Sequence, residues 1–258
     1  MESFRKNVEC IERRCRKYEK VLALFDYDGT LSPIVRDPRR ASMSPKHREW
    51  ITRLTRDPKV EVGIVTGRDL HDIRKRLAMP KLLVAGSHGY EIVRRGKLVL
   101  KRSARDFAPM EDLAQELKAA LGDVPRLSIE HKQYSIAIHY RRVPPKDRAR
   151  VRRTVDRLAA PYCEAHDWTI THQKMNREIR PADKWNKGKA IEWIWKKFAP
   201  RAMPFYIGDD ATDEDAFRAL GKRGITVRVG KVRSSAAHYY VHHIDEIEPW
   251  IEWLLNDF

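Results

Sequence analysis

The stretch at residues 21–31, VLALFDYDGTL, decides how the rest of the chain is interpreted. Its first five residues are apolar, which is typical of a short strand buried on both faces in a parallel sheet. Two carboxylates, Asp26 and Asp28, follow at the carboxyl end of this strand, and Gly29-Thr30 turns the chain away. Open α/β sheets carry their chemistry at the carboxyl ends of their strands. The stretch therefore predicts a parallel sheet with a functional site beside Asp26.

The two carboxylates are close enough to repel one another unless a cation neutralises them. A hard cation with oxygen ligands, such as Mg²⁺, suits this pair, because a turn can aim one side chain and one backbone carbonyl at the same point. The alternative is an ordinary acidic turn at the end of a strand. The spacing of Asp26 and Asp28 alone does not decide between these two interpretations.

Composition limits the class of protein. The chain has 258 residues, enough for one large domain or two smaller ones, and 42% of them are hydrophobic, as in globular proteins. Apolar runs stay well short of the roughly 20 residues that span a bilayer, and residues 1–20 lack the apolar core of a secretory signal. Three cysteines without CxxC spacing indicate neither a disulfide framework nor a zinc site. We expect a monomeric cytoplasmic protein that does not bind membranes.

The formal net charge of +16 is compatible with an anionic small-molecule substrate and with nucleic acid. The basic residues are dispersed along the chain and mixed with acids, without a basic tail or an aromatic–basic module. We therefore expect no nucleic-acid partner. The apolar positions within residues 1–20 fit a basic, solvated amphipathic helix.

Strands and helices alternate after this N-terminal segment. Their order implies right-handed crossovers and a doubly wound parallel sheet. The second strand ends in Thr66-Gly67-Arg68 and the third in GSHG at 86–89, so three successive strands end in polar or glycine-rich turns. The expected strands are 21–25, 60–65, 82–85, 205–207 and 225–229, with a hairpin at 91–100; the expected helices are 45–55, 70–77, 188–198 and 244–255.

The pattern changes between residues 105 and 180. Alternating apolar and polar residues, as in SIAIHY at 135–140, indicate strands with one covered face. Two pairs of strands, each preceded by a helix (110–121 and 146–158), give the order αββαββ, an antiparallel sheet backed by two helices. The expected parts are a basic helical extension at 1–20, a catalytic core at 21–104 and 181–258, and an inserted α/β domain at 105–180.

Polar side chains at the strand ends and helix starts of the core combine into a phosphoryl-transfer site. Asp26 can act as a carboxylate nucleophile whose aspartyl phosphate divides hydrolysis into two easier steps. Asp28 can serve as general acid for the leaving alcohol and then as base for the attacking water. The Thr66 hydroxyl and the Lys187 ammonium can bind the phosphate oxygens where charge develops. A metal ion can orient the phosphate and offset the repulsion between anions.

The order of these residues resembles the four motifs of the haloacid dehalogenase (HAD) superfamily. The matching residues are DYDGT at 26–30, Thr66, Lys187, and GDD at 208–210 with Asp213. The resemblance implies a HAD-like core in which Asp26 is the nucleophile and Asp28 the acid/base. It also implies that the inserted α/β domain is a cap that selects the substrate.

Three longer strings are similar to the trehalose-6-phosphate phosphatases within that superfamily. They are GSHG at 86–89, RP at 180–181 with WNKGK at 185–189, and GDDATDEDAF at 208–217. The resemblance covers about residues 20–255, with Asn186 standing where the family commonly has Asp. It implies a Mg²⁺ cofactor bound by the side chains of Asp26 and Asp209 and the carbonyl of Asp28, with Asp213 supporting them.

The resemblance also implies which residues bind the substrate. Core candidates are Gly67, Arg68 and His88, although Arg68 could equally pair with a carboxylate and His88 could equally be structural. The cap positions that match sugar-binding residues of the family are Glu130, Lys132, Arg141, Lys174 and Glu178. Carboxylates accept hydrogen bonds from sugar hydroxyls, and Lys or Arg donates to hydroxyls or phosphate.

The activity that the resemblance implies is hydrolysis of trehalose 6-phosphate, with a trehalose-phosphate synthase as a partner that it allows. A phosphatase for another sugar phosphate, such as a glucosyl-glycerol phosphate or mannosyl-phosphoglycerate, stays open because the cap determines the sugar. A non-catalytic regulatory subunit is the alternative from another class. Such a subunit has no need for both Asp26 and Asp28.

Overall fold

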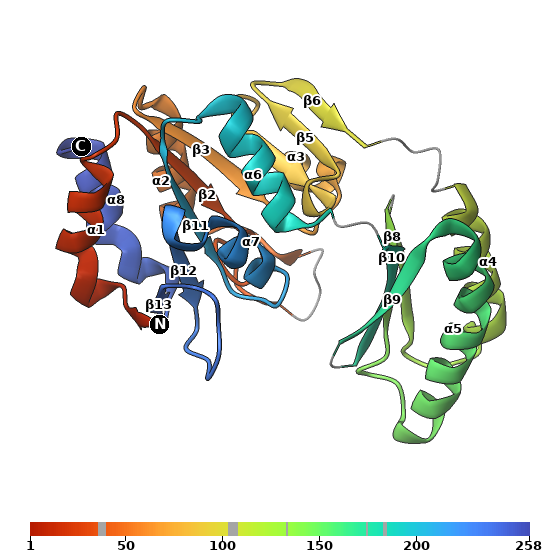
Figure 1. The fold of residues 1–258 in the computed structure, drawn as a ribbon. Coiled ribbons are helices and arrows are strands. Elements are labelled where there is room, and N and C mark those ends of the chain that lie inside the picture. Colours follow the sequence, from red (N-terminus) through yellow and green to blue (C-terminus); the bar gives the residue numbers. More distant parts are fainter. Residues whose placement is uncertain (36–39, 103–107, 133, 174, 183–184) are drawn as a thin grey trace. The chain divides into compact units, whose positions relative to one another are not determined.

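The computed structural model describes residues 1–35, 40–102, 108–132, 134–173, 175–182 and 185–258. The chain divides into two compact units, shown as ribbons in Figure 1. The first, called the core unit below, comprises Met1–Lys101 and Trp185–Phe258. The second, called the cap unit, comprises Arg102–Lys184.

A nine-stranded sheet forms the centre of the core unit. Among the described residues, seven neighbouring strands pair in parallel, and a hairpin adds two antiparallel strands at one edge. Across the sheet the strands are β1 (Glu2–Ser3), β13 (Tyr239–Val241), β12 (Ile225–Val229), β11 (Met203–Gly208), β2 (Val21–Phe25), β3 (Val60–Val65), β4 (Leu83–Gly86), β5 (Glu91–Arg94) and β6 (Lys97–Lys101).

Helices cover both faces of this sheet (Figure 1). In β2, Val21, Ala23 and Phe25 pack on one face and Leu22 and Leu24 on the other, as expected for a strand that is apolar at every position. The doubly wound prediction is confirmed. On the first face lie α1 (Val8–Cys15), α2 (Pro45–Arg56), α3 (Leu70–Leu77) and α8 (Glu248–Asn256); on the second lie α6 (Lys187–Phe198) and α7 (Asp213–Leu220). Short 3-10 helices are η1 (Arg5–Asn7), η3 (Ser87–Gly89), η5 (Gly221–Arg223) and η6 (Ile244–Ile247).

Strand β2 lies where the chain changes direction across the sheet. After β2 the chain continues through β3 and β4 on one side, and later it runs from β11 through β12 to β13 on the other. The connections that follow β2 and its neighbour β11 therefore leave this edge of the sheet in opposite directions. Open α/β sheets bind ligands in the crevice that this creates.

The first 20 residues differ from the expected solvated helix. β1 pairs in parallel with β13, and Phe4, Ile11 and Cys15 are fully buried. The ring of Phe4 packs edge-on against Phe205 and Trp250. The expectation of a solvated helix is wrong for this face, because an apolar stripe stabilises a short helix only when it is covered.

The cap unit is a four-stranded antiparallel sheet, ordered β7-β8-β10-β9, with two helices on one face (Figure 1). Its chain order confirms the αββαββ prediction: α4 (Ala108–Leu121), β7 (Ser128–Lys132), β8 (Ser135–His139), α5 (Pro145–His166), β9 (Trp168–Gln173) and β10 (Asn176–Pro181).

Helix α5 runs well past the expected end at 158 and contains Pro161. Tyr162 stacks on Trp168 and donates a hydrogen bond to Glu116 of α4 at 2.8 Å. These tertiary contacts offset the backbone hydrogen bond that a proline removes from a helix. None of the helices in the described part of the chain combines the length and apolar character that crossing a membrane requires.

Candidate active site

The candidate residues of the core lie where β2, β3 and β11 end. The strand register pairs Phe25 with Ile64 of β3 on one side and with Ile207 of β11 on the other. The residues that follow these three therefore emerge at one edge of the sheet. They include Asp26, Thr66 and Asp209.

Lys187 bridges two buried carboxylates. It begins α6, its side chain is 2% exposed, and its Nζ donates to Asp26 Oδ1 at 2.7 Å and to Asp213 Oδ1 at 2.8 Å. The preceding Asn186 caps the helix, since its side-chain oxygen accepts the Lys189 N–H at 2.9 Å. The asparagine at this position is therefore compatible with a fixed Lys187.

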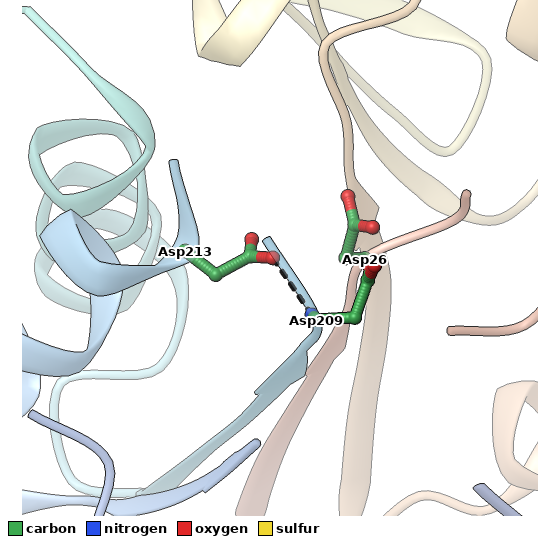
Figure 2. A group of neighbouring side chains, drawn as sticks. All are labelled: Asp26, Asp209 and Asp213. Carbon is green, nitrogen blue, oxygen red and sulfur yellow. Dashed lines mark hydrogen bonds between the residues drawn. The ribbon is translucent and has the colours of Figure 1, made fainter. Parts of the chain in front are cut away.

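The carboxylate of Asp213 is fully engaged by hydrogen bonds. Its Oδ1 accepts from Lys187 and, at 2.6 Å, from the hydroxyl of Tyr206. Its Oδ2 accepts the backbone N–H groups of Asp209 and Asp210, both at 2.9 Å; Figure 2 shows the first of these. Four donors use about all the lone-pair positions of a carboxylate. Asp213 therefore supports its neighbours and is poorly placed to ligate a metal ion directly.

Asp26 and Asp209 come close together from neighbouring strands (Figure 2). One ligand atom from each of Asp26, Asp209 and Asp213 lies within 4.8 Å of the others. This approach needs Gly29, whose φ is +84° and where an added Cβ would lie 2.1 Å from Asp209 Oδ2. Thr30 Oγ1 donates to Asp209 Oδ1 at 3.4 Å. An all-oxygen set of this kind suits Mg²⁺.

Burial and mutual repulsion shift the pKa values in this cluster. Burial raises the pKa of Asp26 well above its usual value, against the opposing charge of Lys187. Burial, followed by the charges of Asp213 and Asp210, raises the pKa of Asp209 to about 7. For Lys187 burial favours the neutral amine, but the nearby carboxylates outweigh it and raise its pKa well above the usual range. The ammonium is retained, and a divalent cation would relieve the repulsion that remains between Asp26 and Asp209.

Asp28 is held by Arg68 in a bidentate ion pair. Arg68 Nε contacts Asp28 Oδ2 and Arg68 Nη2 contacts Asp28 Oδ1, both at 2.6 Å. The remaining nitrogen, Nη1, donates to Asp72 Oδ2 at 2.9 Å, and the same oxygen accepts from Arg76 Nε at 2.8 Å. The guanidinium lies 5.6 Å from the ring centre of Tyr27. Arg68 therefore pairs with carboxylates, which is one of the two alternatives that the sequence left open for it.

Thr66, Gly67 and His88 contact one another just after the end of β3. The buried Thr66 accepts the Arg68 N–H on its Oγ1 at 3.2 Å and the His88 N–H on its carbonyl at 2.8 Å. The His88 ring lies against Gly67, where an added Cβ would be 2.7 Å from His88 Cε1. Ser87 and His88 both have positive φ, 48° and 56°. Consecutive left-handed residues other than glycine are strained, and such strain concentrates at functional sites.

Glu130 of β7 and Glu178 of β10 lie on the sheet face that α4 and α5 leave open. Ile138 and Ile179 pack against the helices, so the residues that alternate with them belong to the opposite face. The register aligns Glu130, Ala137 and Glu178 in one row across three strands. Two carboxylates thus flank one small side chain.

Hydrogen bonds within the cap hold these carboxylates to different degrees. The buried Glu178 accepts from Ser135 Oγ at 3.0 Å, whereas Glu130 Oε2 lies 3.5 Å from His139 Nε2 with both side chains about half exposed. The other cap candidates are Arg141, which is exposed after β8, Lys132, the last residue of β7, and Lys174, which lies outside the described residues.

The comparison with known proteins agrees with this geometry. A family model described as trehalose-phosphatase matches residues 24–244, a range that includes every candidate site residue. The chain belongs to the trehalose-phosphatase family.

Curated relatives extend the similarity over most of the chain. The probable trehalose-phosphate phosphatase D of Arabidopsis thaliana is 33% identical over 257 residues, which cover 93% of this chain and 68% of the plant protein. The trehalose-phosphate phosphatase of Mycobacterium tuberculosis is 34% identical over 212 residues, which cover 80% of this chain and 52% of the relative. The chain thus spans about half the length of the mycobacterial protein.

Solved structures share the two-unit fold of this family member. The C-terminal domain of the C. albicans trehalose-6-phosphate phosphatase aligns with a TM-score of 0.79 at 25% identity, covering 96% of each chain. The C-terminal domain of a Candida albicans trehalose synthase regulatory protein aligns with a TM-score of 0.74 at 12% identity, a likeness that shows the fold alone. With the family match, these findings establish the chain as a phosphatase of the HAD type.

Three residues that hold this trehalose-phosphatase site together are not apparent from the sequence motifs: Tyr206, Asp72 and Arg228. Arg228 of β12 donates to the carbonyl of Asp209 at 2.6 Å and to Glu214 Oε1 at 3.0 Å. Tyr206 interrupts the apolar strand MPFYIG, and Arg228 is the one charged residue of the strand ITVRV. That interruption is the sequence signal that could have found them, because buried polar groups require partners.

Proposed function

We propose that this chain is a Mg²⁺-dependent phosphatase that hydrolyses trehalose 6-phosphate to trehalose and inorganic phosphate. The observation that carries the proposal is the buried contact of 2.7 Å between Lys187 and Asp26, in a chain that matches the trehalose-phosphatase family over residues 24–244. A cation and a carboxylate so placed can hold and attack a phosphate group. An ordinary acidic turn at the end of a strand does not require a buried lysine in contact with its carboxylate.

Asp26 is the proposed nucleophile. A carboxylate oxygen of Asp26 attacks phosphorus, and the bond from phosphorus to the sugar oxygen breaks as the new one forms. Asp28 gives its proton to that sugar oxygen, so trehalose leaves as a neutral alcohol. The hydroxyl of Thr66 and the ammonium of Lys187 bind the non-bridging oxygens, where negative charge develops.

The aspartyl phosphate is then hydrolysed. Asp28 takes a proton from a water molecule whose oxygen attacks phosphorus, and the bond from phosphorus to Asp26 breaks, which releases inorganic phosphate and restores the Asp26 carboxylate. The bidentate pair with Arg68 suits a carboxylate anion, which is the form that accepts this proton. The first step needs Asp28 protonated, so Asp28 has to leave Arg68 before it donates.

The residues that would hold Mg²⁺ are Asp26 and Asp209 by side chain and Asp28 by its carbonyl. When bound, the cation offsets the repulsion between an anionic nucleophile and an anionic substrate. The carboxylate oxygens of Asp26 and Asp209, which lie within 4.8 Å of one another, support this assignment. Asp213 supports the set through the Asp209 N–H.

The open face of the cap sheet is the proposed site for the sugar. Glu130 and Glu178 can accept hydrogen bonds from sugar hydroxyls, and the two flank the small Ala137 in one row. Further substrate contacts, proposed from the family resemblance, are assigned to Gly67, Arg68 and His88 in the core and to Lys132, Arg141 and Lys174 in the cap.

Partners and location stay predictions of the sequence. We expect a monomeric cytoplasmic protein with a trehalose-phosphate synthase as the one protein partner that the resemblance allows. We expect no affinity for nucleic acid at physiological salt, despite the formal charge of +16. Affinity for DNA or RNA that falls steeply with added salt would contradict this expectation.

The test is phosphate release from a panel of sugar phosphates, with Mg²⁺ and with a chelator. Metal-dependent release chiefly from trehalose 6-phosphate is the expected result. Comparable rates on glucose 6-phosphate and other monosaccharide phosphates would retain the chemistry and overturn the trehalose assignment. No release from any substrate would favour a non-catalytic regulatory subunit, the alternative that the sequence leaves open.

A further inference from the structure

Tyr206 is a fully buried residue of β11 that belongs to no motif of the site. Its ring packs among apolar neighbours, with its centroid 5.9 Å from that of Phe217. Its hydroxyl donates to Asp213 Oδ1 at 2.6 Å. A phenylalanine would fill the same space, so the part of this side chain that requires an explanation is its hydroxyl.

The oxygen that accepts from Tyr206 also accepts from Lys187 at 2.8 Å. An ammonium has three N–H donors, and within the described part of the chain Lys187 directs two of them to Asp26 and Asp213. The third donor is the one that a phosphate oxygen can use. Where that donor points depends on how firmly the other two are held.

The two oxygens of Asp213 serve different neighbours. Oδ1 holds Lys187 and Tyr206, on the side of the nucleophile. Oδ2 holds the backbone N–H groups of Asp209 and Asp210, next to the second candidate metal ligand, Asp209. Lys187 is a proposed phosphate donor and not a proposed metal ligand, so a group that acts on Lys187 through Oδ1 should affect phosphate binding more than Mg²⁺ binding.

We propose that Tyr206 is a positioning residue that orients Lys187 toward the phosphate group through the shared oxygen of Asp213. Without the hydroxyl, Oδ1 loses one of its two donors and the carboxylate turns toward Lys187. The ammonium then shifts away from Asp26 and its third N–H no longer meets the phosphate oxygen. The inference rests on the proposed phosphate-binding role of Lys187 and adds a residue that the motifs do not contain.

The matched pair of variants is Tyr206→Phe and Tyr239→Phe. Both remove one hydroxyl from a buried tyrosine of the same sheet, and Tyr239 of β13 lies two strands away from β11. Its ring packs edge-on against Phe4, a contact that phenylalanine retains. Thermal unfolding of both variants verifies that each one folds.

The first measurement needs no turnover: inorganic phosphate is titrated calorimetrically into each protein at saturating Mg²⁺, and Mg²⁺ is titrated alone. Tyr206→Phe is expected to weaken phosphate binding about tenfold and to change Mg²⁺ binding by less than about twofold, since one hydrogen bond to a charged group is lost. Tyr239→Phe is expected to change neither. Equal phosphate affinity in the two variants, or a loss of Mg²⁺ affinity as large as the loss of phosphate affinity, would overturn the inference. Wild-type protein that binds no phosphate would overturn it too.

The second measurement is phosphate release from trehalose 6-phosphate. Tyr206→Phe is expected to lower kcat/KM about 10- to 100-fold while the Mg²⁺ concentration for half-maximal rate stays within about twofold. If the wild-type protein binds phosphate but releases none from this substrate, the proposed function fails, and the calorimetric comparison still decides the role of Tyr206. If the wild-type protein releases phosphate and both variants have its kcat/KM, the proposed role of Tyr206 is wrong and the proposed function stands.

Discussion

The core unit and the cap unit hold their polar residues in different ways. In the core, the side chains of Asp26, Lys187 and Asp213 are 5%, 2% and 0% exposed and are joined by hydrogen bonds of 2.7 and 2.8 Å. In the cap, the side chains of Glu130 and His139 are 51% and 45% exposed and approach only to 3.5 Å. The two units belong to one family match, yet the core fixes these three charges and the cap presents Glu130 and His139 to solvent.

This difference follows from the two tasks proposed for the units. Stabilising a developing charge requires donors fixed in advance, because groups that must reorient during the reaction stabilise it less. Accepting hydrogen bonds from sugar hydroxyls requires exposed groups that lose little when the ligand is absent. Substitutions in the core should therefore change kcat, and the loss of the buried cation should also change stability, whereas substitutions in the cap should change KM.

The largest effect is expected for Asp26→Asn. The variant keeps the shape of the side chain and removes the nucleophile, so phosphate release should fall by roughly a thousandfold or more. Its stability should change little, since Lys187 keeps its contact with Asp213 at 2.8 Å. Phosphate release and thermal unfolding measure the two effects. The control is Asp57→Asn, the same change at a half-buried position after α2, and activity in Asp26→Asn near that of this control would contradict the role of Asp26.

Lys187→Met should reduce both activity and stability. It leaves Asp26 and Asp213 as buried carboxylates without their cation, and breaking a buried ion pair on one side costs about 3–5 kcal/mol. Phosphate release should fall by roughly 10²–10³, as when one donor to a developing oxyanion is removed. Urea denaturation and phosphate release are the measurements. The control is Lys189→Met, an exposed lysine of the same helix, and equal stability of the two variants would contradict a structural role for the buried cation.

The smaller effect in the cap is expected for Glu178→Gln. The change keeps the shape of the side chain but weakens its acceptors, so KM for trehalose 6-phosphate should rise about tenfold with kcat within about twofold. Steady-state kinetics separate the two parameters. Glu116→Gln makes the same change on α4, where the side chain accepts a hydrogen bond from Tyr162, and it should leave both parameters unchanged. A fall in kcat for Glu178→Gln without a change in KM would place this residue with the core chemistry.

The sequence predicts the centre of the core more accurately than its margins. The ends of β2, β3 and β12 are found to the residue, because each is a short stretch rich in Val, Ile or Leu that is bounded by polar or glycine-rich turns. β1 and β13 have two and three residues. Strands this short have no pattern of their own, and they form because a neighbouring strand offers its edge.

In the candidate site, too, features that depend on local sequence are predicted better than contacts between distant elements. The spacing of Asp26 and Asp28 is local, so the sequence shows it directly. The contacts of Tyr206 with Asp213 and of Arg68 with Asp28 join different elements, and residue types alone do not reveal which partner a buried polar group chooses. The cap residues are harder still, since the row of Glu130, Ala137 and Glu178 across three strands exists only once the register is known.

The smallest expected effect is on the way the free energy of unfolding depends on pH. Burial, followed by the charges of Arg14 and Lys222, lowers the pKa of His238 below its ordinary value of 6.5. As pH falls through 6.5 the unfolded chain takes up a proton that the native core does not, so the free energy of unfolding falls until the lowered native pKa is reached. His238→Asn keeps an acceptor near Thr226 and removes this proton uptake. Urea denaturation at about pH 5.5 and about pH 7.5 should show a smaller pH dependence in the variant, by less than about 1 kcal/mol because the imidazole is partly solvated. The control is His139→Gln in the exposed face of the cap, and an equal reduction in that variant would mean that burial in the core is not the cause.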